Sequence, residues 1–156
     1  AIDYSVTGPS GRASGWACDV RKTHPYSIYP ELDFEQVVME EGDSMARFKC
    51  RMKEIEQSAH IIEQLIDNIP DGDYCAKVPK VLKLPVGQWF QMVEGCRGVF
   101  AVYIESDGST KPYRLKIAPP CLPLAAVVDH ITSGNKIADL ITIGGSLDYI
   151  VPDMDR

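Results

Sequence analysis

The sequence predicts an α+β fold in which one long helix packs with shorter C-terminal helices and a β-hairpin flanks them. Apolar residues recur at alternating intervals of three and four between residues 45 and 69, which is typical of a helix packed along a seam. An Asp-Gly pair at residues 107–108 separates two apolar runs, as in a hairpin. Pro119-Pro120 then precedes two further segments with helical patterns.

Residues 1–41 are expected to form an extended loop region. Glycine and proline recur at short intervals, and each proline disfavours helix in the residue before it. They are Gly8, Pro9, Gly11, Gly15, Pro25 and Pro30. The glycines lack the lysine and the preceding strand of a phosphate-binding loop. They indicate instead a close approach of the backbone to a neighbouring element, with Arg12 held inward.

Residues 42–70 are expected to form the long helix. Its apolar stripe comprises Met45, Phe48, Met52, Ile55, Ala59, Ile62, Ile66 and Ile69. Asp43 or Ser44 can cap the helix start, and Pro70-Asp71-Gly72 stops it. Most of the charged residues on the remaining surface are expected to be solvated or paired within the helix. These are Arg47, Arg51, Lys53, Glu54, Glu56 and Glu63.

The remaining residues divide into three regions. Residues 71–93 contain Pro79, Pro85 and Gly87 and are expected to be a connector. Residues 94–118 hold the hairpin, with strands at 99–105 and 111–117. Residues 119–156 hold the C-terminal helices, at 122–132 and 137–143, and a tail.

Composition excludes several functions. The chain has 156 residues, 45% of them hydrophobic, which is enough for one ordinary domain with a core. A net charge of −6 disfavours nucleic acid as a partner. No apolar run approaches the roughly 18 residues that span a bilayer. The cysteines form no C-x-x-C pair, so we expect no metal site and predict buried, reduced thiols. They are Cys18, Cys50, Cys75, Cys96 and Cys121.

Several motifs occur together across nearly the whole chain. They are Gly8-Pro9, Arg12-Ala13-Ser14-Gly15, Glu105-Ser106-Asp107-Gly108-Ser109, Pro112-Tyr113-Arg114, Asp139 and the last eleven residues from Ser146 to Arg156. In combination they resemble the C-terminal half of the D subunit (49 kDa subunit) of respiratory complex I, either separate or from a fused C/D polypeptide. The resemblance, with the missing initiator Met, implies a single C-terminal fragment of a larger subunit. The connector lacks an insertion usual in that family.

That family is related to the large subunits of nickel-iron hydrogenases, so the resemblance implies a hydrogenase-like fold. Hydrogenase large subunits end in the pattern Asp-Pro-Cys-x-x-Cys-x-x-His. Laid on Asp148, the cysteine positions fall on Ile150 and Asp153, and the histidine position falls on Arg156. Nickel and iron in such a site need thiolate ligands. A true hydrogenase is therefore disfavoured.

The resemblance implies a part in forming the quinone-reducing site of complex I. Electrons would pass from NADH through iron-sulfur clusters on other subunits to quinone, coupled to proton translocation. Iron-sulfur clusters and FMN would be carried by partner subunits, and no cofactor by this chain. The implied partners are the iron-sulfur subunit beside the quinone site and the membrane arm, at the cytoplasmic face of the inner membrane. The isolated fragment is expected to be inactive.

The resemblance also nominates site residues. Asp148 and Ile150 would line or brace the quinone chamber, and Arg12, Asp19 and Arg21 are candidates for a charged core. From the residues alone, Asp148 can equally cap a helix or pair with an arginine, and Asp19 with Arg21 can be a simple ion pair. His24, His60 and His130 are interpreted as ordinary loop or helix residues. A structural or assembly module of a hydrogenase-like membrane complex, without redox role, remains the alternative function.

Overall fold

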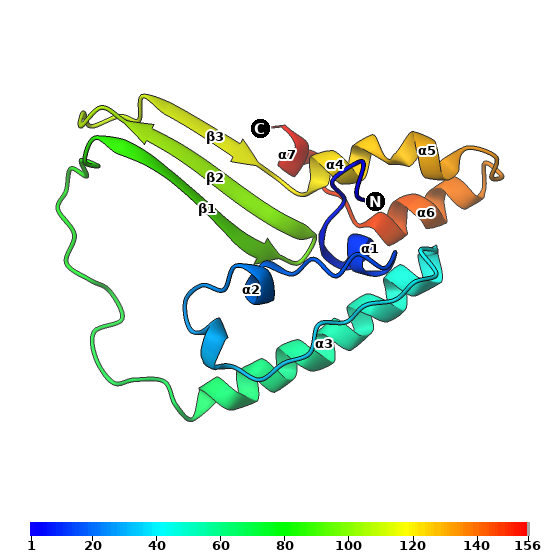
Figure 1. The fold of residues 1–156 in the computed structure, drawn as a ribbon, viewed down its shortest axis with the longest axis horizontal. Coiled ribbons are helices and arrows are strands. Elements are labelled where there is room, and N and C mark those ends of the chain that lie inside the picture. Colours follow the sequence, from blue (N-terminus) through cyan, green and yellow to red (C-terminus); the bar gives the residue numbers. More distant parts are fainter. Residues whose placement is uncertain (156) are drawn as a thin grey trace.

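The computed structural model describes residues 1–155, and its mixture of helices with one small sheet confirms the α+β class. The helices are α1 (Gly8–Arg12), α2 (Val20–Thr23), α3 (Ser44–Ile66), α4 (Cys121–Ala126), α5 (Val128–Thr132), α6 (Asp139–Leu147) and α7 (Val151–Met154), with a 3₁₀ turn at Tyr29–Glu31. The strands are β1 (Gly87–Gly95), β2 (Gly98–Ser106) and β3 (Arg114–Ala118). In Figure 1 the sheet extends to the upper left and α3 to the lower left, whereas α4, α5 and α6 lie to the right.

The long helix is present as α3. Asp43 caps it by accepting a hydrogen bond from the Ala46 N–H at 2.7 Å. Asp43 was one of the two candidates for this cap, because a short side chain with an oxygen can reach the free N–H groups of the first turn. The predicted seam, however, is mostly exposed. The α3 stripe is exposed at Met45, Phe48, Met52, Ile55, Ala59, Ile62 and Ile66. A different face, carrying Ala46, Arg47 and Cys50, turns inward instead.

Residues 1–41 are more regular than an extended loop, which corrects that expectation. Pro9 lies in the first turn of α1, where its missing N–H costs no helical hydrogen bond. Asp19 caps α2 by accepting from the Arg21 N–H at 3.0 Å. Both helices have fewer than six residues, too few to give a periodic apolar pattern in the sequence.

The predicted hairpin is present as β2 and β3, which pair antiparallel from Ala101 with Ala118 to Glu105 with Arg114. The expected connector at 71–93 is wrong beyond residue 86, because β1 begins there and pairs antiparallel with β2. The sheet order is β1-β2-β3. Cys96 and Arg97 make the turn between β1 and β2. They lack the Asn-Gly or Asp-Gly signal of a tight hairpin, so this strand has no local cue in the sequence.

The C-terminal helices follow the predicted order with altered bounds. The expected helix at 122–132 is divided into α4 and α5, which meet at Val127. The helix expected at 137–143 is α6, and it runs four residues further, to Leu147. It ends at Asp148, whose left-handed backbone has φ of 59° and ψ of 36°. Of these helices, α6 makes the main contact with α3, while α4 and α5 pack around α6 and α7.

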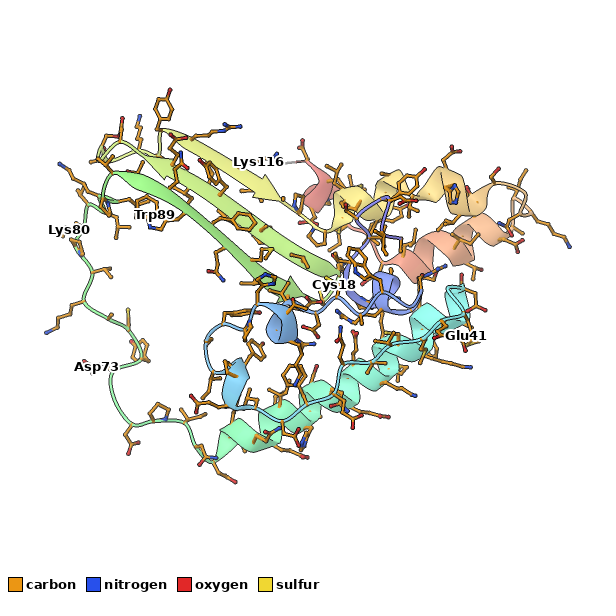
Figure 2. The ribbon with its side chains drawn as sticks, viewed as in Figure 1. Cys18, Glu41, Asp73, Lys80, Trp89 and Lys116 are labelled. Carbon is orange, nitrogen blue, oxygen red and sulfur yellow. The ribbon has the colours of Figure 1, made fainter. Side chains whose placement is uncertain are left out.

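The apolar core is small and divided in two. One cluster, formed by Val6, Leu124, Val127 and Leu147, joins the N-terminal turn to the C-terminal helices. A second, formed by Ala13, Ala46 and Cys50, joins α1 to α3. Within residues 1–155, no helix is both long and apolar enough to cross a bilayer. Side chains of the connector, such as Asp73 and Lys80, project into solvent (Figure 2).

A buried arginine occupies the space between these elements. The Arg12 side chain is 2% exposed and forms ion pairs with Glu54 of α3 and Glu94 of β1, both at 2.7 Å. It also donates to the carbonyl oxygen of Cys18 at 2.8 Å. Burial lowers the pKa of Arg12, but the two glutamates outweigh this and raise it, so the guanidinium stays charged. Charge pairing thus joins α1, α3 and β1, where apolar contact is sparse.

Two glycines allow the N-terminal turn to meet the sheet, as predicted from the glycine pattern. A Cβ on Gly8 would lie 2.5 Å from the Cα of Gly98, and a Cβ on Gly98 would lie 2.5 Å from Thr7 Oγ1. Thr7 Oγ1 also accepts a hydrogen bond from the Val99 N–H at 2.9 Å. The φ of Gly98 is 136°, a region that residues with side chains rarely adopt.

Replacing Gly98 with alanine should therefore destabilise the fold. We expect a loss of roughly 2 to 4 kcal/mol in the free energy of unfolding, from strained backbone and from the clash with Thr7. Urea unfolding of the parent and the variant measures the difference. Gly145→Ala is the matched control, because a Cβ there meets open space within α6 and alanine favours helix by about 1 kcal/mol. Equal urea midpoints for parent and Gly98→Ala would contradict the close approach.

Replacing Arg12 with methionine should cost more than replacing an ordinary surface arginine. The change leaves Glu54 and Glu94 without their buried partner, which typically costs about 3 to 5 kcal/mol. Arg12→Lys should lie between, because one ammonium cannot reproduce the spread of the guanidinium donors. Arg114→Met on exposed β3 is the control. Thermal unfolding in which Arg12→Met and Arg114→Met behave alike would refute the role of this arginine.

Candidate functional site

A cavity of about 360 Å³ opens beside Arg12 and is named here the charged cavity. Helix α1, helix α3, the end of β1 and the end of α6 all contribute to its walls. Its lining residues are Pro9, Arg12, Arg21, Arg51, Glu54, Ile55, Ser58, Glu94, Gly95, Cys96 and Asp148. Six of these eleven residues carry a guanidinium or a carboxylate group, so the cavity offers many polar partners to water and protons.

Asp19 and Arg21 form the edge of this cluster. Arg21 donates to both carboxylate oxygens of Asp19, at 3.0 and 2.7 Å, so the expected ion pair is present. Arg12 lies 4.0 Å from the same carboxylate. Burial raises the pKa of Asp19, but the Arg21 hydrogen bonds and the charges of Arg21 and Arg12 outweigh it. The net pKa lies below the ordinary value, and the carboxylate stays ionised.

Two arginines hold the end of α6. Arg51 donates to the carbonyl oxygens of Ser146 at 2.6 Å and Leu147 at 3.2 Å. Arg97 donates to the Asp148 carbonyl oxygen at 2.6 Å and to its carboxylate at 3.2 Å. These positive groups satisfy the carbonyls that a helix end leaves unpaired and favour its dipole. Asp148 thus ends a helix and pairs with an arginine, which are the two structural roles open to it from sequence.

A second cavity, of about 430 Å³, lies between α3 and α6 and is named the apolar cavity. Its lining residues are Ser44, Met45, Phe48, Arg51, Thr142, Gly145, Ser146 and Asp148. Arg51 and Asp148 line both cavities. This pair therefore stands where a mainly apolar chamber meets a charged one, the combination that a ring-shaped ligand with polar substituents requires.

Arginines next to this junction are strongly desolvated. Arg47 is 6% exposed and donates to Ser146 Oγ, Ser44 Oγ and the Gly42 carbonyl oxygen. Burial first and the charge of Arg51 second lower the pKa of Arg47. Burial likewise lowers the pKa of Arg51, and the Asp148 carboxylate offsets part of this effect. Of the six charged residues, most of which were expected to be solvated or paired within the helix, Lys53, Glu56 and Glu63 are exposed. Arg47, Arg51 and Glu54 instead bind groups outside the helix.

The structure brings together four of the five nominated residues. Arg12, Arg21 and Asp148 line the charged cavity, and Asp19 binds Arg21. Ile150 is not among the lining residues of either cavity. It is 40% exposed, and its N–H donates to Cys121 Sγ at 3.4 Å. Ile150 therefore lies outside both cavities, and its part in the site stays a prediction.

Sequence reasoning missed the residues that complete this cluster. They are Arg51, Glu54, Glu94 and Arg97. Glu54 had one usable signal, because it lies on the same helix face as buried Cys50, four residues earlier. Glu94 and Arg97 had none, since the strand and turn that place them were not predicted. His24 and His130 are exposed, and so is His60, whose Nδ1 lies 4.0 Å from Glu63.

The thiols are free and scattered. Cys50 and Cys121 are buried, Cys18 is half-buried, and Cys75 and Cys96 are exposed, so the prediction of buried thiols holds for two of them. Burial, reinforced by the charge of Glu54, raises the pKa of Cys50 to about 11, which keeps it a protonated thiol. No group of three metal-ligating side chains gathers within residues 1–155. Arg156, laid on the hydrogenase histidine, falls outside the described residues.

The sequence matches one family along its full length. The model of the respiratory-chain NADH dehydrogenase 49 kDa subunit matches residues 1–84 and 76–156. The C/D subunit of NADH-quinone oxidoreductase from Bacteroides thetaiotaomicron is 54% identical over 156 residues, which are 100% of this chain and 29% of that protein. The D subunit of the same enzyme from Desulfotalea psychrophila is 46% identical over 154 residues, 98% of this chain and 41% of that protein.

A solved structure agrees with this match. A chain of the membrane-bound sulfane sulfur reductase, an archaeal respiratory membrane complex, superimposes with a TM-score of 0.92 and 45% identity. The alignment covers 100% of this chain and 44% of that one. The chain thus spans less than half the length of each of these three relatives. From its fold, its sequence and its full-length family match, the chain belongs to the 49 kDa subunit family of respiratory-chain NADH dehydrogenase.

Proposed function

We propose that this chain is part of a complex I subunit and helps to form its quinone-reducing site. In the assembled enzyme, electrons from NADH reach quinone through iron-sulfur clusters on other subunits, and the reaction is coupled to proton translocation. The observation that carries the proposal is that Arg51 and Asp148 each line both the charged cavity and the apolar cavity. The names of relatives that are 54% and 46% identical support quinone as the substrate.

The chemistry of quinone reduction suits this junction. Two electrons and two protons convert a quinone into a quinol, so the chamber needs apolar walls for the ring and a supply of protons beside it. Met45 and Phe48 in the apolar cavity can contact a ring or its tail. The Asp148 carboxylate, held by Arg97, can orient water that supplies protons from the charged cavity.

The proposal also covers the evolutionary origin of the site and the partners of the chain. With a hydrogenase-like architecture, this junction stands where the metal site of the ancestral enzyme stood. The chain itself holds no cofactor, and FMN and the clusters belong to partner subunits. Its partners are the iron-sulfur subunit beside the site and the membrane arm, which keep it peripheral at the cytoplasmic face of the inner membrane. The sulfane sulfur reductase relative supports the view that one fold serves more than one acceptor.

A structural or assembly role is the second candidate. It is favoured by the geometry of Asp148, which ends α6 in a left-handed conformation and binds Arg97. A residue that only anchors the β1–β2 turn to α6 would matter for assembly and not for quinone chemistry. The two functions therefore make different predictions for variants of Asp148.

Asp148→Asn should lower quinone reduction in the assembled complex. Asparagine tolerates the left-handed backbone and its amide oxygen can still accept from Arg97, so the variant removes charge with little change of shape. We expect quinone reductase activity to fall about tenfold or more, or its pH profile to shift, because a proton-transfer group is lost. NADH oxidation by an artificial acceptor and the yield of complex should be unchanged.

The control is Asp129→Asn on exposed α5. Wild-type quinone reduction in Asp148→Asn would exclude the proton role. A lower yield of complex with normal activity per complex would favour the assembly role.

Ile150 should act through its size. Ile150→Phe enlarges a 40% exposed side chain next to Asp148, and we expect a several-fold change in KM for quinone or in inhibitor sensitivity, with little change in thermal stability. Val151→Phe, at a 66% exposed neighbour, is the matched control. The nomination of Ile150 fails if Ile150→Phe binds quinone and inhibitor as the wild type and Val151→Phe do.

A further inference from the structure

The residues that follow Asp148 are anchored at one point. Residues 149–155 are named here the C-terminal tail. Within the described residues, the C-terminal tail forms hydrogen bonds to the rest of the chain only at Cys121. Apolar packing holds it weakly, because the first side chains of the tail are 36%, 40% and 66% exposed. The placement of the tail therefore depends on Cys121.

Cys121 binds the tail in two ways. It begins α4 and its side chain is fully buried. Its sulfur accepts a hydrogen bond from the Ile150 N–H at 3.4 Å, and its own N–H donates to the Asp153 carboxylate at 3.1 Å. Burial raises the pKa of the Cys121 thiol and a hydrogen bond to Asp153 raises it further, so the thiol stays neutral. Both contacts hold α7, which lies beside the start of α4 (Figure 1).

This anchor is fixed relative to the residue that binds Asp148. The start of α4 packs against the β1–β2 turn, since a Cβ on Gly98 would lie 3.2 Å from the Cβ of Pro120. Arg97 of that turn holds Asp148, whereas α4 holds Ile150 two residues later. Two residues of chain span at most about 7 Å. A displacement of Ile150 is therefore passed on to Asp148.

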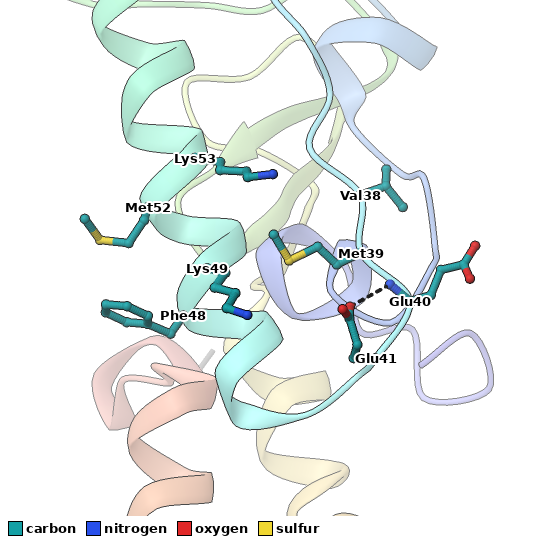
Figure 3. A pocket seen from close by; sticks show the side chains of 8 residues that line it. All are labelled: Val38, Met39, Glu40, Glu41, Phe48, Lys49, Met52 and Lys53. Atoms are coloured by element: carbon teal, nitrogen blue, oxygen red, sulfur yellow. Dashed lines mark hydrogen bonds between the residues drawn. The ribbon is translucent and has the colours of Figure 1, made fainter.

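The tail adjoins the candidate site through Asp148. Within residues 1–155, the tail contributes no residue to the charged cavity or to the apolar cavity. It also lies outside the open groove of about 790 Å³ between α3 and the segment containing Val38 and Met39 (Figure 3). Asp148, which lines both the charged and the apolar cavity, immediately precedes the tail.

We propose that Cys121 is a positioning residue of the quinone-reducing site. By binding Ile150 and Asp153 it fixes the C-terminal tail, and thereby the direction in which the Asp148 carboxylate faces the two cavities. Cys121 lines neither cavity, so it acts on placement and not on chemistry. This role rests on the proposed function, because it concerns the same carboxylate.

The full-length subunit in its assembled complex provides the test. Cys121→Ala removes the acceptor for the Ile150 N–H, whereas Cys121→Ser keeps a group that can accept and donate. For Cys121→Ala we expect faster amide hydrogen exchange in the tail and several-fold slower quinone reduction, with normal NADH oxidation by an artificial acceptor. Cys121→Ser should restore most of both. Val127→Ala, which removes buried apolar atoms at the other end of α4, is the control and should change neither.

A double variant separates positioning from a general loss of structure. If Cys121 acts through Asp148, Cys121→Ala should slow quinone reduction in the parent but not further in the Asp148→Asn background. Equal losses in both backgrounds would overturn the positioning role. So would unchanged tail exchange in Cys121→Ala, or a loosened tail with parental quinone reduction while Asp148→Asn is impaired. Parental activity in Asp148→Asn itself would overturn the proposed function as well.

Discussion

The fold depends on the charge pairing of Arg12. Its guanidinium reaches a glutamate on the long helix, a glutamate on the first strand and a carbonyl oxygen of the N-terminal segment. One apolar cluster joins the same two helices, α1 and α3, and the other joins the N-terminal turn to the C-terminal helices. Neither cluster contains many large side chains, and neither includes β1. A buried ion cluster of this kind stabilises only while every member is paired, since each isolated charge is costly in a low-dielectric interior. The arrangement therefore fixes geometry more than it adds stability.

Sequence patterns predicted the elements whose signals are local. Asp43 before an apolar repeat predicted the start of α3, and Asp107-Gly108 predicted the β2–β3 hairpin. Gly8 predicted a close approach of backbones. The predictions failed where the structure depends on contacts between residues that are distant in the sequence. Nothing in Cys96-Arg97 indicates a tight turn, so β1 was missed, and with it Glu94. The 3,4 repeat predicted a packed seam, but it could not say which element would pack there.

The candidate site shows the same limit. Arg12, Asp19, Arg21 and Asp148 were nominated, and the structure places them in or beside one charged cavity. Arg51 belonged to a set of charged residues that were expected for the most part to be solvated or paired within the helix, because the 3,4 pattern separates only apolar from polar faces. In the structure Arg51 is half-buried against the end of α6 and donates to two of its carbonyl oxygens. Burial of an arginine among carbonyl oxygens leaves no periodic mark in a sequence, so only a structure reveals it.

The β1–β2 turn has a mechanical consequence. Arg97 ties the root of the sheet to the residue that ends α6, and Gly98 packs against Thr7 at the same point. The far end of the sheet, with exposed Trp89 and Phe90, extends away from the helices (Figure 1). The sheet is thus a long arm with a short, tightly held root. A rotation imposed at the far end would therefore act on this root, where Arg97 binds the Asp148 carboxylate at 3.2 Å.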